Sequence, residues 1–385
     1  MLLSDAGFPG VRLSAFYFLF FAGVGIFAPY WTLYLESLGL DAATIGTLMA
    51  LLMATRIVGP NLWGWVADHL GRRMGVIRSG ACVAMLLFAG VPGVREPLPL
   101  ALLLVAYYLF WTAVLPQFEA VTLGHLGQHA SGYSRIRLWG SVGFVISSAA
   151  VGPLLDASGA GILPWLVLIS MGTVAAMSFA VTEPLPAARV RGGSAPRSPL
   201  PLRAVVLLLL ACALMQASHG PYYVFFSIYL QGLGYSGAQI GALWALGVVA
   251  EVGLFALMPR LLASAPHVPI FVLCFALTAL RWLMLGLLPA SVPVLVLVQL
   301  LHAVSFGAFH ALAIALVHRL FGDARQGRGQ ALYSSLSFGA GGAAGSAAAG
   351  LLWAGAGAQA SWLAAAAAAA LGGVVALGIG VDGRR

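Results

Sequence analysis

Long apolar segments alternate with short polar turns along almost the whole chain of 385 residues. About 20 consecutive apolar residues form a helix long enough to cross a bilayer. The pattern predicts helices at about residues 12–37, 43–66, 74–93, 98–124, 134–156, 162–182, 204–231, 238–260, 269–288, 293–318, 329–355 and 359–380. The predicted fold class is therefore an all-α membrane protein with twelve transmembrane helices.

The helices fall into two sets of six, which are separated by a polar stretch with five prolines and four arginines. Residues 34–51 match residues 229–246 at ten of eighteen positions, where chance would give about two. Six spans return the chain to its starting side, so the two copies run in the same direction. We predict two six-helix bundles related by a parallel repeat, residues 1–183 and 204–385, joined by a cytoplasmic linker at 184–203. Transporters built this way hold their site between the bundles.

Charge is scarce and unevenly placed. The chain is 61% hydrophobic and 8% charged, its mean hydropathy is +0.98, and all nineteen basic residues are arginine. Fifteen arginines lie on the side of the linker, and only Arg95 lies in an opposite loop. This bias predicts a multi-pass protein of the bacterial cytoplasmic (inner) membrane with both termini in the cytoplasm. The net charge of +8 is then explained by the orientation of the protein in the membrane. It does not indicate a basic surface for nucleic acid, so no nucleic-acid partner is expected.

A charged motif joins the second and third predicted helices. Residues 64–73 follow the pattern Gly-x-x-x-Asp-x-x-Gly-Arg-Arg, formed by Gly64, Asp68, Gly71, Arg72 and Arg73. The motif resembles the signature loop of the major facilitator superfamily, which implies the major facilitator fold and a cytoplasmic gate that holds one conformation. Gly64 is expected to allow close helix approach, and Asp68 to accept charge-assisted hydrogen bonds.

The run Tyr-Ser-Arg-Ile-Arg-Leu-Trp-Gly-Ser-Val-Gly-Phe at residues 133–144 covers the start of the fifth predicted helix. This run looks like the fifth span of the proton-coupled sugar permeases. The resemblance implies that Glu119 and Arg137 contact substrate. Phe144 stands where galactoside permeases have a Trp, which argues against galactosides. Intramembrane charges are costly and mark functional sites, but a static ion pair between two helices is the alternative.

Three further runs, residues 216–223, 246–251 and 301–310, resemble the phenylpropionic acid permease group of the same superfamily. Aromatic and polar residues also share single helix faces in these runs and in the fourth and fifth helices, as the lining of a ligand cavity does. Helix packing is the other explanation of such stripes. The predicted substrate-binding residues are Glu119, Arg137, Trp111, Phe144, His219, Tyr222 and Tyr223.

Four ionisable residues lie within predicted spans eight to ten: Glu251, Arg281, His302 and His310. Histidine changes charge near physiological pH, and a buried Glu can hold a proton. The related sugar permeases carry their proton machinery on the same spans, although a second carboxylate and a Lys found there are missing here. We predict that these four residues couple transport to protons. The alternative is a structural ion pair between Glu251 and Arg281, with each His bonding a neighbouring helix.

Together these observations predict a secondary transporter that works by alternating access as a proton symporter. A small aromatic carboxylate such as phenylpropionate is the favoured cargo, and a sugar is the second choice. Proton-antiport exporters of drugs or metabolites share the same signature loop, so export by proton antiport is the alternative function. The sequence contains no zinc-protease, hydrolase-elbow or P-loop motif, so we expect no enzyme, cofactor or metal. The expected partners are the cargo, protons and the bilayer, and the expected oligomeric state is a monomer.

Overall fold

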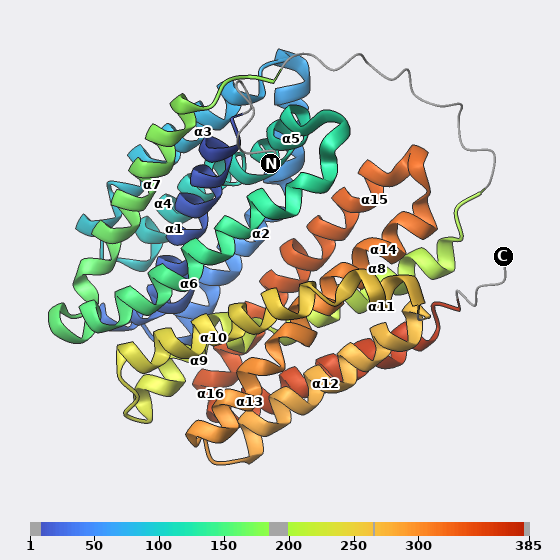
Figure 1. Cartoon of the computed structure of the whole chain (residues 1–385). Helices are drawn as coiled ribbons and strands as arrows, with labels where there is room; N and C mark the ends of the chain where they lie inside the picture. The colour runs from blue at the N-terminus through green and yellow to red at the C-terminus, as the bar shows by residue number, and fades with distance from the viewer. Residues whose placement is uncertain (1–8, 185–198, 265, 381–385) are drawn as a thin grey trace. The chain divides into compact units, whose positions relative to one another are not determined.

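The computed structural model describes residues 9–184, 199–264 and 266–380, and helices make up nearly all of them (Figure 1). The first half forms α1 (Gly10–Ser37), α2 (Ala42–Leu70), α3 (Arg73–Phe88), α4 (Pro97–Trp111), α5 (Val114–Leu126), α6 (Tyr133–Ser158) and α7 (Leu163–Ala180). The second half forms α8 (Leu202–Ser218), α9 (Gly220–Gly232), α10 (Gly237–Phe255), α11 (Met258–Ser264), α12 (His267–Leu287), α13 (Val292–Leu300), α14 (Phe309–Phe321), α15 (Gln326–Tyr333) and α16 (Gly342–Leu377). Two π-helical segments, η4 (Ala303–Ala308) and η6 (Ser334–Gly341), interrupt the second half. Most of the predicted linker lies outside the described residues.

Eleven stretches of the described chain are long and apolar enough to cross a membrane. The last, Asp323–Leu377, has 55 residues and covers both the eleventh and the twelfth predicted spans. At about 1.5 Å per residue it is far longer than the roughly 30 Å hydrocarbon core. Its backbone leaves helical geometry at Gly357, where φ is 80° and ψ is −179°. The predicted all-α membrane architecture is confirmed, and the count of twelve stays a prediction.

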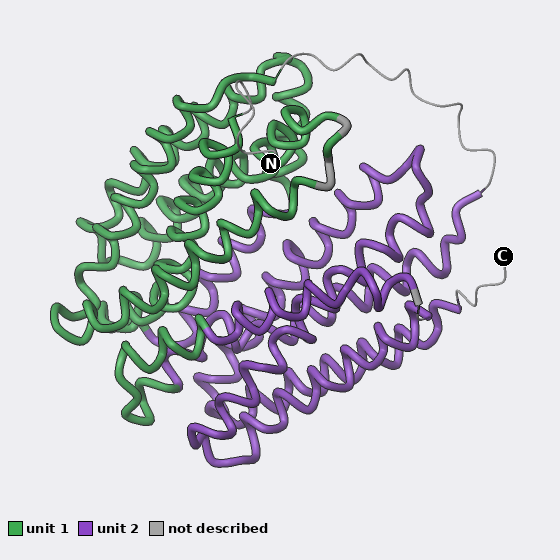
Figure 2. Tube along the Cα trace, viewed as in Figure 1, with its two compact units in different colours: residues 1–40, 58–189, 230–245 green, residues 41–57, 190–229, 246–385 purple. Residues whose placement is uncertain are grey.

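Two compact units are distinguished by their internal contacts (Figure 2). Unit 1 comprises residues 1–40, 58–189 and 230–245, and unit 2 comprises residues 41–57, 190–229 and 246–385. Each unit therefore contains most of one half of the chain and one short segment from the other. In unit 1, α6 meets the start of α10 so closely that a Cβ on Gly152 or Gly237 would overlap the other's backbone. In unit 2, Gly46 and Gly350 bring α2 and α16 together in the same way.

The start of α10 is capped from two directions. Ser236 and Gln239 form a capping box, in which the Ser236 N–H donates to Gln239 Oε1 (2.9 Å) and the Gln239 N–H donates to Ser236 Oγ (3.2 Å). Asp156, near the end of α6, accepts from the N–H groups of Gly237 (2.7 Å) and Ala238 (3.0 Å). A carboxylate at a helix N-terminus also complements the helix dipole, so this joint is held by charge as well as by packing.

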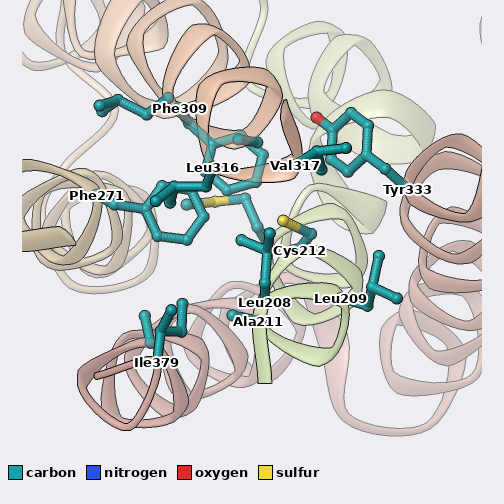
Figure 3. Packing of buried hydrophobic residues seen from close by; sticks show 14 of the residues in the cluster. Leu208, Leu209, Ala211, Cys212, Phe271, Phe309, Leu316, Val317, Tyr333 and Ile379 are labelled. Atoms are coloured by element: carbon teal, nitrogen blue, oxygen red, sulfur yellow. The ribbon is translucent and has the colours of Figure 1, made fainter. Parts of the chain in front are cut away.

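Each unit has its own apolar core. In unit 2, side chains from α8, α12, α14 and α15, among them Cys212, Phe271, Phe309 and Tyr333, are fully or almost fully buried (Figure 3). In unit 1, Phe16 of α1 stacks on Phe118 of α5 with ring centroids 3.6 Å apart. Lipid is as apolar as these cores, so close packing rather than water exclusion stabilises them. The cores fix the helices that carry the polar residues described next.

Candidate functional site

Unit 1 carries a polar cluster on α1, α5 and α6. The Tyr133 hydroxyl donates to Glu119 Oε1 at 3.2 Å. The Arg137 guanidinium lies over the ring of Phe21, 3.8 Å from its centroid, and 5.8 Å from that of Tyr17. Among the described residues, Arg137 forms no ion pair with Glu119 and donates no hydrogen bond. The two predicted residues lie in one cluster, but the static ion pair considered as an alternative is not formed.

Local sequence explains where this guanidinium lies. Gly140 follows Arg137 by one turn of α6, and a Cβ there would overlap both the Arg137 Nη1 and the Phe21 ring. The absent side chain therefore makes room for the stacked pair. Trp111, at the end of α4, is half-buried and stacks on Phe20 with ring centroids 5.1 Å apart. Phe144 is buried at 7% exposure on α6.

The charged motif of unit 1 forms a surface network. Arg73 pairs with Asp68 at 2.5 Å and donates to Gln117 Oε1 at 2.6 Å. The Glu183 carboxylate accepts from the N–H groups of Arg73 and Met74, both at 2.9 Å, and so caps the start of α3. Sequence reasoning missed Gln117 and Glu183, because both are distant from the motif along the chain.

The remaining motif residues have simpler roles. Gly71 has a φ of +64°, a left-handed conformation that favours glycine. Arg72 is exposed and precedes α3. A Cβ on Gly64 would meet only Gln117 Nε2 at 3.7 Å, which is ordinary contact. Close helix approach is therefore not what Gly64 provides in this structure.

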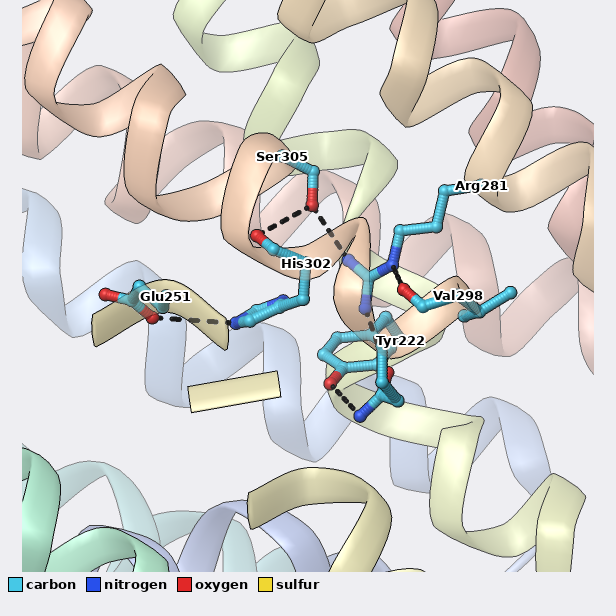
Figure 4. Close-up of polar contacts among 7 residues, drawn as sticks. Tyr222, Glu251, Arg281, Val298, His302 and Ser305 are labelled. Atoms are coloured by element: carbon cyan, nitrogen blue, oxygen red, sulfur yellow. Dashed lines mark hydrogen bonds and ion pairs between the residues drawn. The ribbon is translucent and has the colours of Figure 1, made fainter. Parts of the chain in front are cut away.

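Unit 2 holds a second polar cluster, centred on Arg281 of α12 (Figure 4). The guanidinium is fully buried. Its Nε donates to the Val298 carbonyl (2.8 Å), Nη1 to Ser305 Oγ (2.9 Å) and Nη2 to Gln299 Oε1 (3.2 Å). These acceptors lie where α13 gives way to the π-helical η4. Arg281 therefore holds a helix break in place.

Aromatic rings complete the surroundings of Arg281. Its guanidinium carbon lies 4.3 Å from the ring centroid of Tyr222 and 4.4 Å from that of Trp282, at cation–π distance. Among the described residues it forms no ion pair with any carboxylate. The ion pair between Glu251 and Arg281 considered above is thus wrong. The guanidinium turns instead to acceptors at the helix break, and Glu251 Oε2 lies 3.9 Å from His302 Nε2.

Two histidines of this cluster are buried with one ring nitrogen each that has no hydrogen-bond partner. His219 Nδ1 lies 2.8 Å from the Met215 carbonyl, which assigns a proton to that nitrogen, and its Nε2 has no partner. His302 Nδ1 likewise has none. A bare nitrogen lone pair is tolerable in such a place, whereas a buried N–H without an acceptor is costly. Both rings are therefore suited to the neutral form.

The third histidine belongs to a stack of rings along η4 and α14. His302 and Phe306 are 5.5 Å apart with an interplanar angle of 8°, and Phe306 and His310 are 6.2 Å apart at 12°. The wider turn of a π-helix lets side chains four residues apart lie over one another. At the far end, His310 Nδ1 lies 2.9 Å from the Tyr333 hydroxyl.

The predicted residues thus form two clusters, one in each unit. Unit 1 brings Glu119 and Arg137 together and carries Trp111 and Phe144, whereas unit 2 contains His219, Tyr222, Tyr223, Glu251, Arg281, His302 and His310. Sequence reasoning missed the neutral partners Tyr17, Phe21, Trp282, Gln299 and Tyr333, and it gave Ser305, in the run 301–310, no role of its own. Tyr133 stood in a motif already singled out, but its bond to Glu119 depends on the fold. No group of three metal-binding side chains occurs in the described chain.

Comparison with known proteins places this chain. The MFS_1 like family matches residues 11–364. The probable 3-phenylpropionic acid transporter of Escherichia coli (strain K12) is 31% identical over 336 residues, which cover 85% of this chain and 86% of that protein. The maltose permease of Geobacillus stearothermophilus is 27% identical over 336 residues, covering 85% and 83%.

Solved structures give the same fold. A variant of the nucleoside transporter NupG superposes with a TM-score of 0.83 at 16% identity, covering 96% of this chain and 99% of that one. The peptide transporter PepTSo, of the POT family, gives 0.74 at 13% identity, with 96% of each chain covered. The chain therefore belongs to the MFS_1 like family, within the major facilitator superfamily, and is a multi-pass membrane transporter rather than an enzyme.

Proposed function

We propose that the protein is a proton-coupled symporter that takes up a small aromatic carboxylate such as phenylpropionate. The observation that carries this proposal is the Arg137 guanidinium. It lies within a membrane span, half-buried, stacked on an aromatic ring and without a hydrogen bond to any described residue. An ionisable residue within a membrane span is by default a candidate functional site. A planar guanidinium fork suits a carboxylate, and neighbouring rings suit an aromatic body.

Relatives support the class of cargo. The 31% identical E. coli protein is named as a probable 3-phenylpropionic acid transporter. The candidate residues of unit 1 suit the two parts of such a cargo. Arg137 would bind the carboxylate, and Trp111 and Phe144 would pack against the aromatic ring. Glu119, held by Tyr133, would accept a hydrogen bond from a hydroxylated cargo. His219, Tyr222 and Tyr223 are proposed as substrate-binding residues within unit 2.

Proton coupling is assigned to unit 2. The Glu251 side chain keeps 16% of its surface exposed, so protons can reach it, and His302 lies beside it. His310 belongs to the same ring stack, and Arg281 supplies a permanent charge. The network of Asp68 and Arg73 would act as the cytoplasmic gate, together with Gly64, Gly71 and Arg72.

The finer topology belongs to this proposal. Gly357 would divide the 55-residue stretch into spans eleven and twelve, which gives six spans to each half of the chain. The arginine bias would place both termini and the linker in the cytoplasm. The protein would act as a monomer in the bacterial inner membrane, alternating between inward and outward access.

Uptake into proteoliposomes tests the function. An imposed inward proton gradient should drive accumulation of labelled 3-phenylpropionate above its external concentration, and an uncoupler should abolish it. Glu251→Gln should exchange the cargo without accumulating it. Accumulation that is unchanged by the uncoupler would contradict symport.

Two competing functions are separated in the same assay. Extrusion of the cargo against the same gradient would indicate a proton-antiport exporter. Uptake of maltose in place of phenylpropionate would indicate a sugar transporter. A sugar is the second candidate because the maltose permease is 27% identical and because Glu119 and Arg137 follow the sugar-permease pattern.

A further inference from the structure

Arg56 is a third arginine deep within a membrane span, and neither polar cluster includes it. It lies fourteen residues from each end of α2 (Ala42–Leu70), which is about 21 Å along the helix axis in either direction. An arginine near a helix end can extend its side chain to the membrane interface, but one at the middle of a long span cannot. The guanidinium therefore holds its charge at a depth where charge is costly.

The packing of unit 2 places this guanidinium over an aromatic ring. The π-helical η6 meets α2 so closely that a Cβ on Gly339 would come within 2.7 Å of the Ile57 side chain. The Ser335 hydroxyl donates to the Ile57 carbonyl at 3.0 Å. These contacts fix the backbone next to Arg56, whose guanidinium carbon lies 5.3 Å from the ring centroid of Phe338. Segments of π-helix are frequent at functional sites.

The Phe338 ring is itself held by two other rings. The centroids of His310 and Tyr333 lie 5.9 Å and 5.8 Å from that of Phe338, with interplanar angles of 69° and 80°. The face of an aromatic ring attracts a cation, but the ring carries no net charge. The contact therefore orients the Arg56 guanidinium and leaves its positive charge uncompensated.

The described part of unit 2 supplies no counter-charge to Arg56. Among residues 9–184, 199–264 and 266–380, Arg56 forms no ion pair and donates no hydrogen bond. Away from the helix ends, the spans of this unit contain two arginines, Arg56 and Arg281, and one acidic residue, Glu251. At least one positive charge is therefore in excess. Arg281 has three hydrogen-bond acceptors, so the unmet demand lies at Arg56.

We propose that Arg56 binds one small monovalent anion within unit 2, at a second anion site made of different residues from the proposed cargo site at Arg137. A guanidinium offers five N–H donors and suits a carboxylate through two parallel hydrogen bonds. A halide can accept from the same donors. The anion balances the excess charge of unit 2 in the middle of the span. Phe338 is a positioning residue, because it orients the guanidinium without accepting its hydrogen bonds.

Thermal unfolding of the detergent-purified full chain tests this site, because an anion that binds only the folded protein raises its melting temperature. Chloride or formate replaces the larger anion isethionate at constant ionic strength. For the wild type we expect a saturable rise of roughly 2 °C at ten times the Kd of the anion. Arg56→Gln should lose this rise. Arg135→Gln is the matched control, since it removes an exposed arginine and should keep the full rise.

Two probes distinguish the sources of the anion. A rise with formate alone, absent in Arg56→Gln, assigns the site to a small carboxylate, and a rise with both anions assigns it to halides as well. The cargo site is read separately with 3-phenylpropionate. Arg137→Gln should lose the stabilisation by phenylpropionate and keep that by chloride or formate, and Arg56→Gln should show the reverse.

Three results would overturn the inference. The first is a wild type without a saturable response to either anion, and the second is a response that persists unchanged in Arg56→Gln. The third is a response that only Arg137→Gln abolishes. Should Arg56→Gln fail to fold, Arg56→Lys keeps the charge but lacks the planar fork. Its half-saturating formate concentration should rise several-fold, and an unchanged value contradicts a site at Arg56.

Discussion

Arg137 in unit 1 and Arg281 in unit 2 both lie within membrane spans and over aromatic rings, but they differ in burial and in hydrogen bonding. Arg281 is fully buried and donates to three neutral acceptors. Arg137 is half-buried, rests on Phe21 and donates no hydrogen bond to the described residues. A guanidinium that donates from each of its three nitrogens supports structure, whereas one that donates no hydrogen bond is ready for a ligand. We infer that the two arginines serve different tasks.

This difference also divides the two polar clusters. Unit 2 has a closed network, in which Arg281, Gln299 and Tyr222 satisfy one another. Unit 1 has an open one, in which Glu119 accepts a hydrogen bond from Tyr133 and accepts none from Arg137. We infer that substitutions in the first network change stability and that substitutions in the second change cargo recognition.

The largest effect should come from Arg281→Lys. The ammonium keeps the charge but cannot reach acceptors on Val298, Gln299 and Ser305 together. Each hydrogen bond to a charged group contributes about 1.5–3 kcal/mol, so the free energy of unfolding should fall by roughly 3 kcal/mol. Thermal unfolding of the purified protein in detergent measures this loss. Arg137→Lys is the control and should melt within a degree or two of the wild type, so equal losses in the two variants would refute the comparison.

Arg137→Gln should give the next largest effect, this time on transport. Loss of a charged bond to the cargo carboxylate, about 1.5–3 kcal/mol, corresponds to a roughly 10- to 150-fold fall in kcat/KM for phenylpropionate uptake. The melting temperature should stay near that of the wild type, because Arg137 has no hydrogen bonds to lose.

Arg135→Gln is the matched control for this variant. Arg135 lies two residues earlier on α6 and is exposed, so its loss should leave kcat/KM within about twofold. A similar fall in both variants would show that general surface charge, and not a site at Arg137, governs uptake.

Phe306→Leu should have a smaller effect and should affect stability. It removes a ring that stacks on both His302 and His310, and such pairs contribute about 0.5–1.5 kcal/mol each. We expect about 1 kcal/mol of lost stability with KM unchanged. Phe306→Tyr, which keeps the ring, should restore the melting temperature. A change in KM without a change in stability would place Phe306 in the cargo site instead.

Hydrophobic periodicity predicted the spans well, because lipid imposes one length on every helix that crosses it. The first predicted helix, 12–37, compares with Gly10–Ser37, and the second, 43–66, with Ala42–Leu70. The breaks inside spans were missed. The predicted helix 204–231 is split next to His219, and 293–318 passes through η4. A π-helical segment shifts the backbone hydrogen bonds by one residue, from i+4 to i+5. An apolar run has the same composition in either case, so the sequence pattern does not show where such a break lies.

The candidate site was predicted in part for a similar reason. Ionisable residues stand out in an apolar sequence, so Glu119, Arg137, Glu251 and Arg281 were found. Their neutral partners were not found, because a Gln, Ser or Tyr in a membrane helix is ordinary until the fold shows what it bonds. The ion pair of Glu251 with Arg281, considered as an alternative, is not formed for that reason: Arg281 donates to Val298, Gln299 and Ser305 instead.

Tyr133→Phe should give the smallest effect and tests the open cluster most finely. The change deletes only the hydroxyl that donates to Glu119 at 3.2 Å. A neutral hydrogen bond contributes about 0.5–1.5 kcal/mol, so KM should rise roughly two- to tenfold while kcat holds. Tyr17→Phe is the control. It also deletes one hydroxyl of the unit 1 cluster, but the Tyr17 hydroxyl donates to the buried Thr122 at 3.2 Å and not to Glu119. It should lower the melting temperature slightly and leave KM alone. If both hydroxyl deletions raise KM equally, the hydrogen bond from Tyr133 does not orient Glu119 for cargo binding. The polar cluster of unit 1 would then be a structural network like that of unit 2.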